Sequence, residues 1–243
     1  MKISNSRTII ESLQLMSEGI HEAAHAVVAR VLPSPFQYVE GYRLRSLREI
    51  IEDHTDARSY VLRDPRFSIA DIGWVYRLGD SKRKRRLIRR VYKNCITLMA
   101  GHAADAIFLR ASLTPDERFD RFWNLMSDAL EQTDWQKPRY NDAEQVVLYL
   151  TTVIVNEYGE FDEPRLNAIA GGLYLIAHRA VERNWWCIKA VAGNSIYTEG
   201  ISAKAVNYII DRLAVGHRRR SEDTPNPRLV QRIPSIARTE QSR

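Results

Sequence analysis

Cysteine is scarce in this 243-residue chain, where only Cys95 and Cys187 occur. They lie far apart without zinc-type spacing, which favours two buried, reduced thiols over a thiolate metal site. Long apolar runs are also absent. The most apolar segments, residues 146–155 and 166–177, are far shorter than the roughly 20 apolar residues of a membrane-spanning helix. Residues 1–8 contain no apolar stretch typical of a secretory signal, so we expect a soluble, cytoplasmic protein.

Acidic residues are outnumbered by basic ones, and the formal net charge is +6. The basic residues gather at Lys82–Arg90 and again from Arg218 onward. Such runs can bind nucleic acid or anionic surfaces, although more often they form a solvated helix face or a tail. No aromatic residue interleaves the Lys82–Arg90 cluster. We therefore do not expect nucleic acid as a partner.

The strongest chemical signal is His21-Glu22-Ala23-Ala24-His25, which spells HExxH inside a helical segment. Residues four apart lie on one face of a helix, so His21 and His25 can bind one metal ion. Two neutral imidazoles suit zinc, which lowers the pKa of a bound water from about 15.7 to about 7. Glu22 lies one step round the helix, where its carboxylate can reach that water.

HExxH can also arise by chance on a solvated helix, and the flanking residues distinguish the two cases. They are apolar on nearly every side: Ile20, Ala23, Ala24, Ala26, Val27, Val28, Val31 and Leu32. Such a helix is expected to be buried. Unpaired buried polar groups cost roughly 1–3 kcal/mol each, so a metal ion is favoured over a structural histidine pair.

Helical periodicity dominates the chain and predicts a mainly α fold, with a small β-strand or hairpin element beside the HExxH helix. Helices are expected over residues 8–31, 87–109, 115–135, 141–158, 164–189 and 202–216. Pro115, Asn141 and Gly159 mark helix ends. Strands are expected at Phe36–Arg45 and Ser59–Leu62, in a segment (33–80) that is otherwise irregular. The expected organisation is one domain over residues 1–216 and a basic, disordered tail over residues 217–243.

A catalytic zinc ion usually takes a third protein ligand. The pattern HExxHxxGxxH fails, because Val28 and Val31 replace its Gly and His. A glutamate roughly 20–25 residues beyond the motif, as in thermolysin-like enzymes, would be Glu49 or Glu52, in a stretch typical of a solvated turn. Asp142 follows a loop at a helix start, which can aim its carboxylate, although an N-cap is the simpler role for it. The residues alone leave these alternatives open.

Three sequence blocks, in order, resemble the peptidase domain of the FtsH-type ATP-dependent zinc proteases. They are HEAAHAVVARVLP, LMAGHAADAIFL and YNDAEQVVLYLTTVIVNEYG. That family carries HEAGHA, a GGRAAEE-like segment and an SND-like turn whose aspartate is the third zinc ligand. A long helix and a short C-terminal one follow, so the likeness covers roughly residues 15–215. HExxH alone is common, whereas the three blocks in this order are more specific.

The resemblance assigns a role to each matching residue. His21, His25 and Asp142 would be the zinc ligands, and Glu22 would be the general base. Asp105 stands where the family has a glutamate near the site, so it would orient a ligand through a hydrogen bond.

The chain also departs from the family pattern. Ala24 replaces a glycine, Ala100 and His102 replace the usual glycine and arginine, and the segment between the second and third blocks is longer. His102 is a rival zinc ligand, although a substituted structural position is favoured. No GxxxxGK[ST] phosphate-binding loop occurs. The resemblance therefore implies a stand-alone relative that lacks the ATPase and membrane segments.

We thus expect residues 1–216 to form a zinc metallopeptidase that hydrolyses unfolded or flexible polypeptides without ATP. Zinc is the expected cofactor and a polypeptide the expected substrate, while a homo-oligomer is left open. The alternative is a catalytically weak or inactive peptidase scaffold that binds partners through its basic surfaces. Glu22 favours the enzyme, because a scaffold that had abandoned hydrolysis has no chemical need for this carboxylate.

Overall fold

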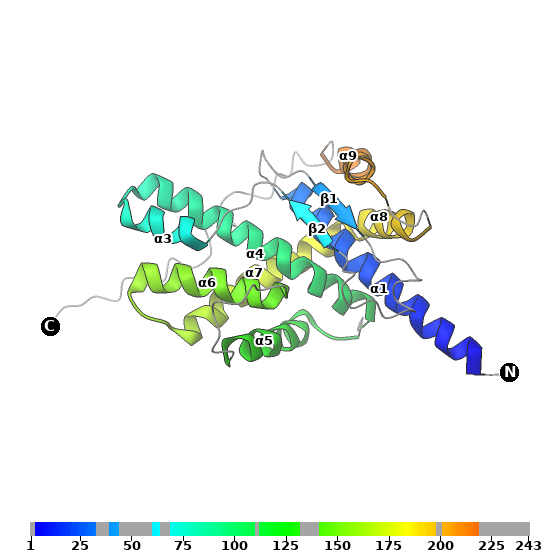
Figure 1. The fold of residues 1–243 in the computed structure, drawn as a ribbon, viewed down its shortest axis with the longest axis horizontal. Helices are drawn as coiled ribbons and strands as arrows, with labels where there is room; N and C mark the ends of the chain where they lie inside the picture. Colours follow the sequence, from blue (N-terminus) through cyan, green and yellow to red (C-terminus); the bar gives the residue numbers. More distant parts are fainter. Residues whose placement is uncertain are drawn as a thin grey trace.

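The computed structural model describes residues 3–32, 39–43, 60–63, 69–109, 112–131, 141–197 and 201–218. In chain order its elements are α1 (Ile3–Val31), β1 (Val39–Arg43), β2 (Tyr60–Arg63), α3 (Ile69–Arg77), α4 (Ser81–Leu109), α5 (Pro115–Glu131), α6 (Asp142–Tyr158), α7 (Glu163–Arg183), α8 (Trp185–Tyr197) and α9 (Ala203–Arg218). The predicted mainly α fold is confirmed (Figure 1).

The core is organised around α4, which runs through the middle of the molecule and packs against α1, α6 and α7 (Figure 1). The second half of α4 is buried and built from small residues, with Ala100, Gly101, Ala103 and Ala104 all in the core. Small side chains allow helix axes to approach closely. As a result, the HExxH helix α1 lies directly against α4.

Three helix ends have the residues that the sequence predicted there. Asn141 caps α6 with its side-chain oxygen, which accepts a hydrogen bond from the Ala143 N–H at 2.8 Å. Gly159 ends the same helix in the left-handed conformation, with φ of 86°. Pro115 is the first residue of α5. These caps determine where α6 begins, and therefore where its first residue, Asp142, is held.

Two of the predicted helices were wrong in their bounds. The single helix predicted over residues 164–189 is two helices, α7 and α8, because Asn184 interrupts it. Its backbone N–H and side-chain amide both donate to the Ala180 carbonyl, at 3.2 and 2.8 Å. Helix α4 begins at Ser81 rather than Leu87, since Asp80 accepts hydrogen bonds from two N–H groups in its first turn. Helix α3 lies in a stretch that the sequence predicted to be irregular or weakly helical.

A short antiparallel ribbon lies against the HExxH helix. Strand β1 pairs with β2, with Arg43 opposite Tyr60 and Tyr42 opposite Val61. Both strands contact α1, and β1 also contacts α9. The two strands overlap the segments that carry the strand pattern in the sequence. Glu49 and Glu52, the alternative metal ligands, and residues 219–243 of the predicted tail lie outside the described residues.

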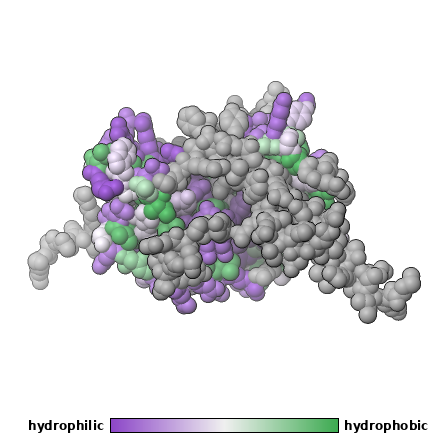
Figure 2. Space-filling model, viewed as in Figure 1, coloured by the Kyte–Doolittle hydropathy of each residue, from purple (hydrophilic) through white to green (hydrophobic). Residues whose placement is uncertain are grey.

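The Lys82–Arg90 cluster forms an exposed face of α4, at the end that pairs with α3. Figure 2 shows hydrophilic and hydrophobic side chains intermixed at this end of the molecule. Some of the charge is neutralised locally, because Lys84 pairs with Glu157 at 2.5 Å and Arg83 with Asp80 at 3.3 Å. None of the described helices is both long and apolar enough to span a membrane.

Candidate metal centre

Two histidines from α1 and one aspartate from α6 converge on a single point. His21 and His25 lie one turn apart on the same face of α1, as the HExxH spacing predicts. Asp142 Oδ2 lies 2.8 Å from His25 Nε2 and 3.3 Å from His21 Nε2. The three donor atoms all lie within 4.8 Å of one another. Residues separated by more than a hundred positions thus form one ligand set.

The Nδ1 atom of each imidazole makes a hydrogen bond to a group on α4. His21 Nδ1 donates to Asp105 Oδ2 at 2.6 Å, and His25 Nδ1 donates to the Thr97 carbonyl at 2.7 Å. Hydrogen bonds of this kind fix the ring orientation and the tautomer of metal-binding histidines. Because each Nδ1 is the donor, both Nε2 atoms are turned toward Asp142.

Gly101 provides the space in which the two rings lie. A Cβ added at this position would lie 2.5 Å from His21 Nε2 and 2.6 Å from His25 Nε2. Thr97 precedes Gly101 by one helical turn and Asp105 follows it by one turn, so the three residues share a face of α4. We call this face the α4 wall; it consists of the Thr97 carbonyl, the space left by Gly101 and the Asp105 carboxylate.

Hydrogen bonds and charges within the cluster shift the pKa values of His21 and Asp142. Burial alone would lower the pKa of His21, but the hydrogen bonds and charges of Asp105 and Asp142 outweigh it and hold the pKa well above its ordinary value. Burial would raise the pKa of Asp142, but the charge of His25 and the hydrogen bonds of both histidines hold it well below its ordinary value. These shifts favour the protonated form of His21 and the ionised form of Asp142.

The donor set fits a divalent metal ion. Zinc–nitrogen bonds of about 2.0–2.1 Å in tetrahedral geometry place neighbouring donors about 3.3 Å apart. The distance from His21 Nε2 to Asp142 Oδ2 has this value, whereas the distance from His25 Nε2 to Asp142 Oδ2, 2.8 Å, is about half an ångström shorter. Two imidazoles and a carboxylate suit zinc, and also iron(II). The geometry therefore supports a metal centre without selecting the element.

Two further polar residues lie at the centre. Glu22 is half-buried on α1, next to His21. His102 follows Gly101 on α4, and its ring makes an edge contact with the His21 ring at a centroid distance of 5.3 Å. Burial, followed by the charge of His21, lowers the pKa of His102 to about 4, so this imidazole is neutral at pH 7. His102 is not part of the three-residue donor set.

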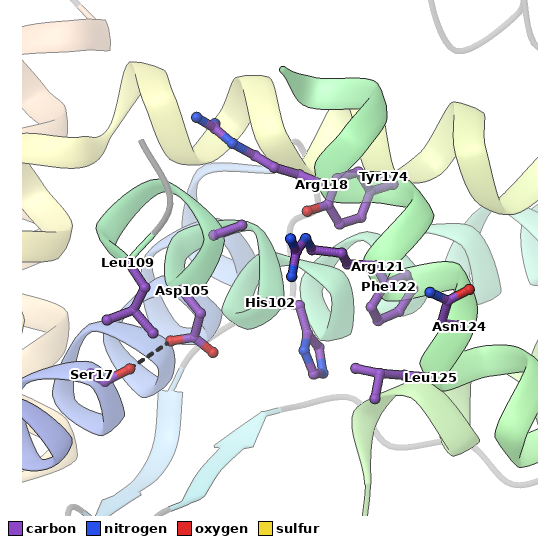
Figure 3. Close-up of a pocket in the computed structure, with 11 residues that line it drawn as sticks. Ser17, His102, Asp105, Leu109, Arg118, Arg121, Phe122, Asn124, Leu125 and Tyr174 are labelled. Atoms are coloured by element: carbon purple, nitrogen blue, oxygen red, sulfur yellow. Dashed lines mark hydrogen bonds between the residues drawn. The ribbon is translucent and has the colours of Figure 1, made fainter. Parts of the chain in front are cut away.

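A cavity of about 450 Å³ opens beside the metal centre (Figure 3). His102 and Asp105 line it from α4, Phe122 and Arg121 from α5, and Tyr174 from α7. Ser17 of α1 donates to Asp105 Oδ1 at 3.3 Å at one side of the cavity. Because Asp105 contacts both His21 and this cavity, the two features are directly adjacent.

The structure brings together four of the predicted site residues, namely His21, His25, Asp142 and Asp105, and the fifth, Glu22, follows His21 on α1. The sequence reasoning missed Thr97 as a site residue, because it acts through its backbone carbonyl and any residue type supplies one. It also missed Gly101 as the position that leaves space for the two rings. Glycine four residues before the matched aspartate was the available signal.

Comparisons with protein-family models, with curated proteins and with solved structures find no match to this chain.

Proposed function

We propose that this protein is a zinc-dependent endopeptidase that hydrolyses peptide bonds in unfolded or flexible polypeptides without ATP. The observation that carries the proposal is the convergence of His21, His25 and Asp142, with Glu22 beside the first ligand. Iron(II) would fit the same three donors, but a glutamate next to the first histidine is the group that a hydrolytic centre requires. The resemblance to FtsH-type peptidase domains is part of the same proposal.

In the proposed mechanism His21, His25 and Asp142 hold the metal. Zinc, when bound, makes a hydroxide-like nucleophile available at neutral pH and polarises the substrate carbonyl. Glu22 accepts the proton of the attacking water and later delivers it to the leaving amine, which completes hydrolysis without a covalent intermediate. Asp105 and the Thr97 carbonyl keep the two imidazoles oriented, so that the ligands do not have to rearrange during the reaction.

The β1–β2 ribbon is the proposed element that binds the substrate backbone. It contacts α1, the helix that carries the HExxH motif. An extended peptide can add to the edge of a sheet through main-chain hydrogen bonds, while pockets select its side chains. The proposed substrates are therefore already extended, such as short peptides, flexible tails or damaged proteins.

The test compares the zinc-loaded protein with its Glu22→Gln variant. Both are incubated with casein, an unstructured substrate, and the products are analysed by mass spectrometry. Cleavage by the parent alone, with equal zinc content in both proteins by elemental analysis, is the expected result. Equal turnover by the variant would refute the role of Glu22, and iron in place of zinc would refute the choice of metal.

A second candidate function is a catalytically weak scaffold that binds a partner through its basic surface. It is favoured by the exposed side chains of the α4 cluster, among them Lys82, Arg85 and Arg89. Binding to phosphates would weaken steeply as salt rises, because binding releases condensed counterions. Salt-sensitive DNA or RNA binding, together with no cleavage of casein, would favour this scaffold over the peptidase.

A further inference from the structure

The cavity beside the metal centre is where a substrate side chain next to the cleaved bond would lie. It shares Asp105 with the centre, and its His102 ring contacts the His21 ring. A volume of about 450 Å³ is large enough to hold a side chain together with water. Its chemistry therefore bears on which substrates the proposed peptidase selects.

The lining of the cavity combines apolar surface with two arginines, Arg118 and Arg121, and the carboxylate of Asp105. Phe122, Leu125 and Leu109 present apolar side chains. Figure 3 shows Arg121 extending from α5 into the space above His102, whereas Arg118 runs along α7. An aliphatic stem with a negatively charged end would match both parts of this lining.

The two arginines differ in burial and in their contacts within the fold. Arg118 is only 7% exposed, and its Nη1 atom lies 2.5 Å from His178 Nε2. His178 in turn pairs with Glu182 at 3.4 Å. Arg118 is thus bound within the fold between α5 and α7, whereas Arg121 is exposed to an incoming ligand.

The carboxylates near Arg121 have hydrogen-bond partners of their own, and the hydrogen bonds from Thr114, together with the charge of Arg121, lower the pKa of Glu117. Asp105 receives hydrogen bonds from Ser17 and His21. Glu117, one turn before Arg121 on α5, accepts hydrogen bonds from the Thr114 N–H and hydroxyl at 2.7 and 2.8 Å. Among the charged residues of the lining, Arg118 is buried and Asp105 is partly buried, so Arg121 is the exposed one.

We infer that this cavity is a subsite for a substrate carboxylate, in which Arg121 binds the negative charge and Phe122 and Leu125 contact the stem. The inference rests on the proposed peptidase function, because it makes the cavity a specificity pocket of that site. The carboxylate can come from an aspartate or glutamate side chain, or from the C-terminus of the polypeptide. Guanidinium–carboxylate pairs are favoured over lysine pairs by their two parallel hydrogen bonds.

The experiment uses fluorescent peptides that differ by Glu or Gln at single positions, each with a free or an amidated C-terminus. Binding to the zinc-loaded Glu22→Gln variant is measured by anisotropy, and cleavage by the zinc-loaded parent is measured by mass spectrometry. A preference of about tenfold for the carboxylate form is expected, which corresponds to about 1.4 kcal/mol, because hydrogen bonds to charged groups are stronger than those to neutral ones. The Glu/Gln pairs and the free/amidated pairs separate the two sources of the carboxylate.

Arg121→Gln, introduced into both proteins, should abolish this preference, and Arg121→Glu should reverse it toward Lys-containing peptides. Arg183→Gln, which removes an exposed arginine near the end of α7, is the matched control and should keep the preference. An unchanged Glu-to-Gln ratio in Arg121→Gln overturns the subsite. Arg121-dependent binding without any cleavage by the parent refutes the peptidase function and supports the carboxylate site, whereas cleavage without charge preference does the reverse.

Discussion

Replacing Gly101 by alanine tests the geometry of the metal centre most directly. The added Cβ would meet His21 Nε2 at 2.5 Å and His25 Nε2 at 2.6 Å, whereas ordinary contacts begin at 3.4 Å. The rings or the helices must therefore separate by roughly 1 Å, which is several times the tolerance of about 0.2 Å in metal–ligand distances. We expect zinc affinity to fall by at least about 10–100-fold, the effect typical of disturbed ligand orientation.

The same substitution should also destabilise the metal-free protein. Overpacking a core costs about 1–3 kcal/mol, while replacing a helical glycine by alanine gains up to about 1 kcal/mol. The overpacking term is the larger, so the free energy of unfolding should fall. Zinc titration of chelator-treated protein against a competing chelator measures the affinity, and urea unfolding measures the stability.

Gly172→Ala on α7 is the matched control, because a Cβ there meets nothing within 4 Å. It should leave zinc affinity unchanged and stabilise the protein slightly. If Gly101→Ala binds zinc as tightly as the parent and stabilises the protein as Gly172→Ala does, the close approach of α4 to the histidines is refuted.

Three further predictions follow from the contacts of the centre. Asp105→Asn, which keeps the shape and removes the charge, should weaken zinc binding about 10–100-fold in the same competition assay, whereas Asp142→Asn should weaken it more. In the metal-free protein, the pKa of His21 is raised, so the stabilisation from His21 should be complete below about pH 6.5 and lost as the pH rises through the raised pKa. The pKa of Asp142 is lowered, so the stabilisation from Asp142 should be present above about pH 4 and lost as the pH falls through the lowered pKa. Urea unfolding of chelator-treated protein should therefore show the largest contribution of this pair between about pH 4 and 6.5, and no such maximum would contradict the pairing. Asn141→Ala should lower the unfolding free energy by about 1 kcal/mol, while Asn141→Ser should restore most of it.

The parts of the structure that the sequence predicted are those with a periodic or chemical signature in side chains. The HExxH spacing predicts that two imidazoles share a face, and Asn141 with Gly159 marks both ends of α6. The start of α4 was missed because its first turns are charged and carry no apolar stripe. The break at Asn184 was missed because asparagine lacks the strong signal of glycine or proline, and helical apolar residues continue on both sides.

Within the site, the sequence predicted the three candidate ligands, and only some of the groups that hydrogen-bond to them. Asp105 was assigned through the resemblance, since a carboxylate leaves a mark in the sequence. The Thr97 carbonyl leaves none, because the backbone is the same in every residue. The cavity and Arg121 were also missed, since three helices must be placed in space before an exposed arginine is known to face the metal centre.

The α4 wall has a consequence for how such a site can be inherited. Its members follow at four-residue steps, and the first of them contributes only a backbone oxygen. Substitutions at most other positions of α4 would therefore leave the centre intact. A single inserted or deleted residue between Thr97 and Asp105 would turn one part of the wall by about 100° relative to the other. The spacing of these residues along the helix, more than the identity of the residues between them, is thus what selection must preserve. In a sequence, this spacing is visible as a glycine four residues before an acidic residue.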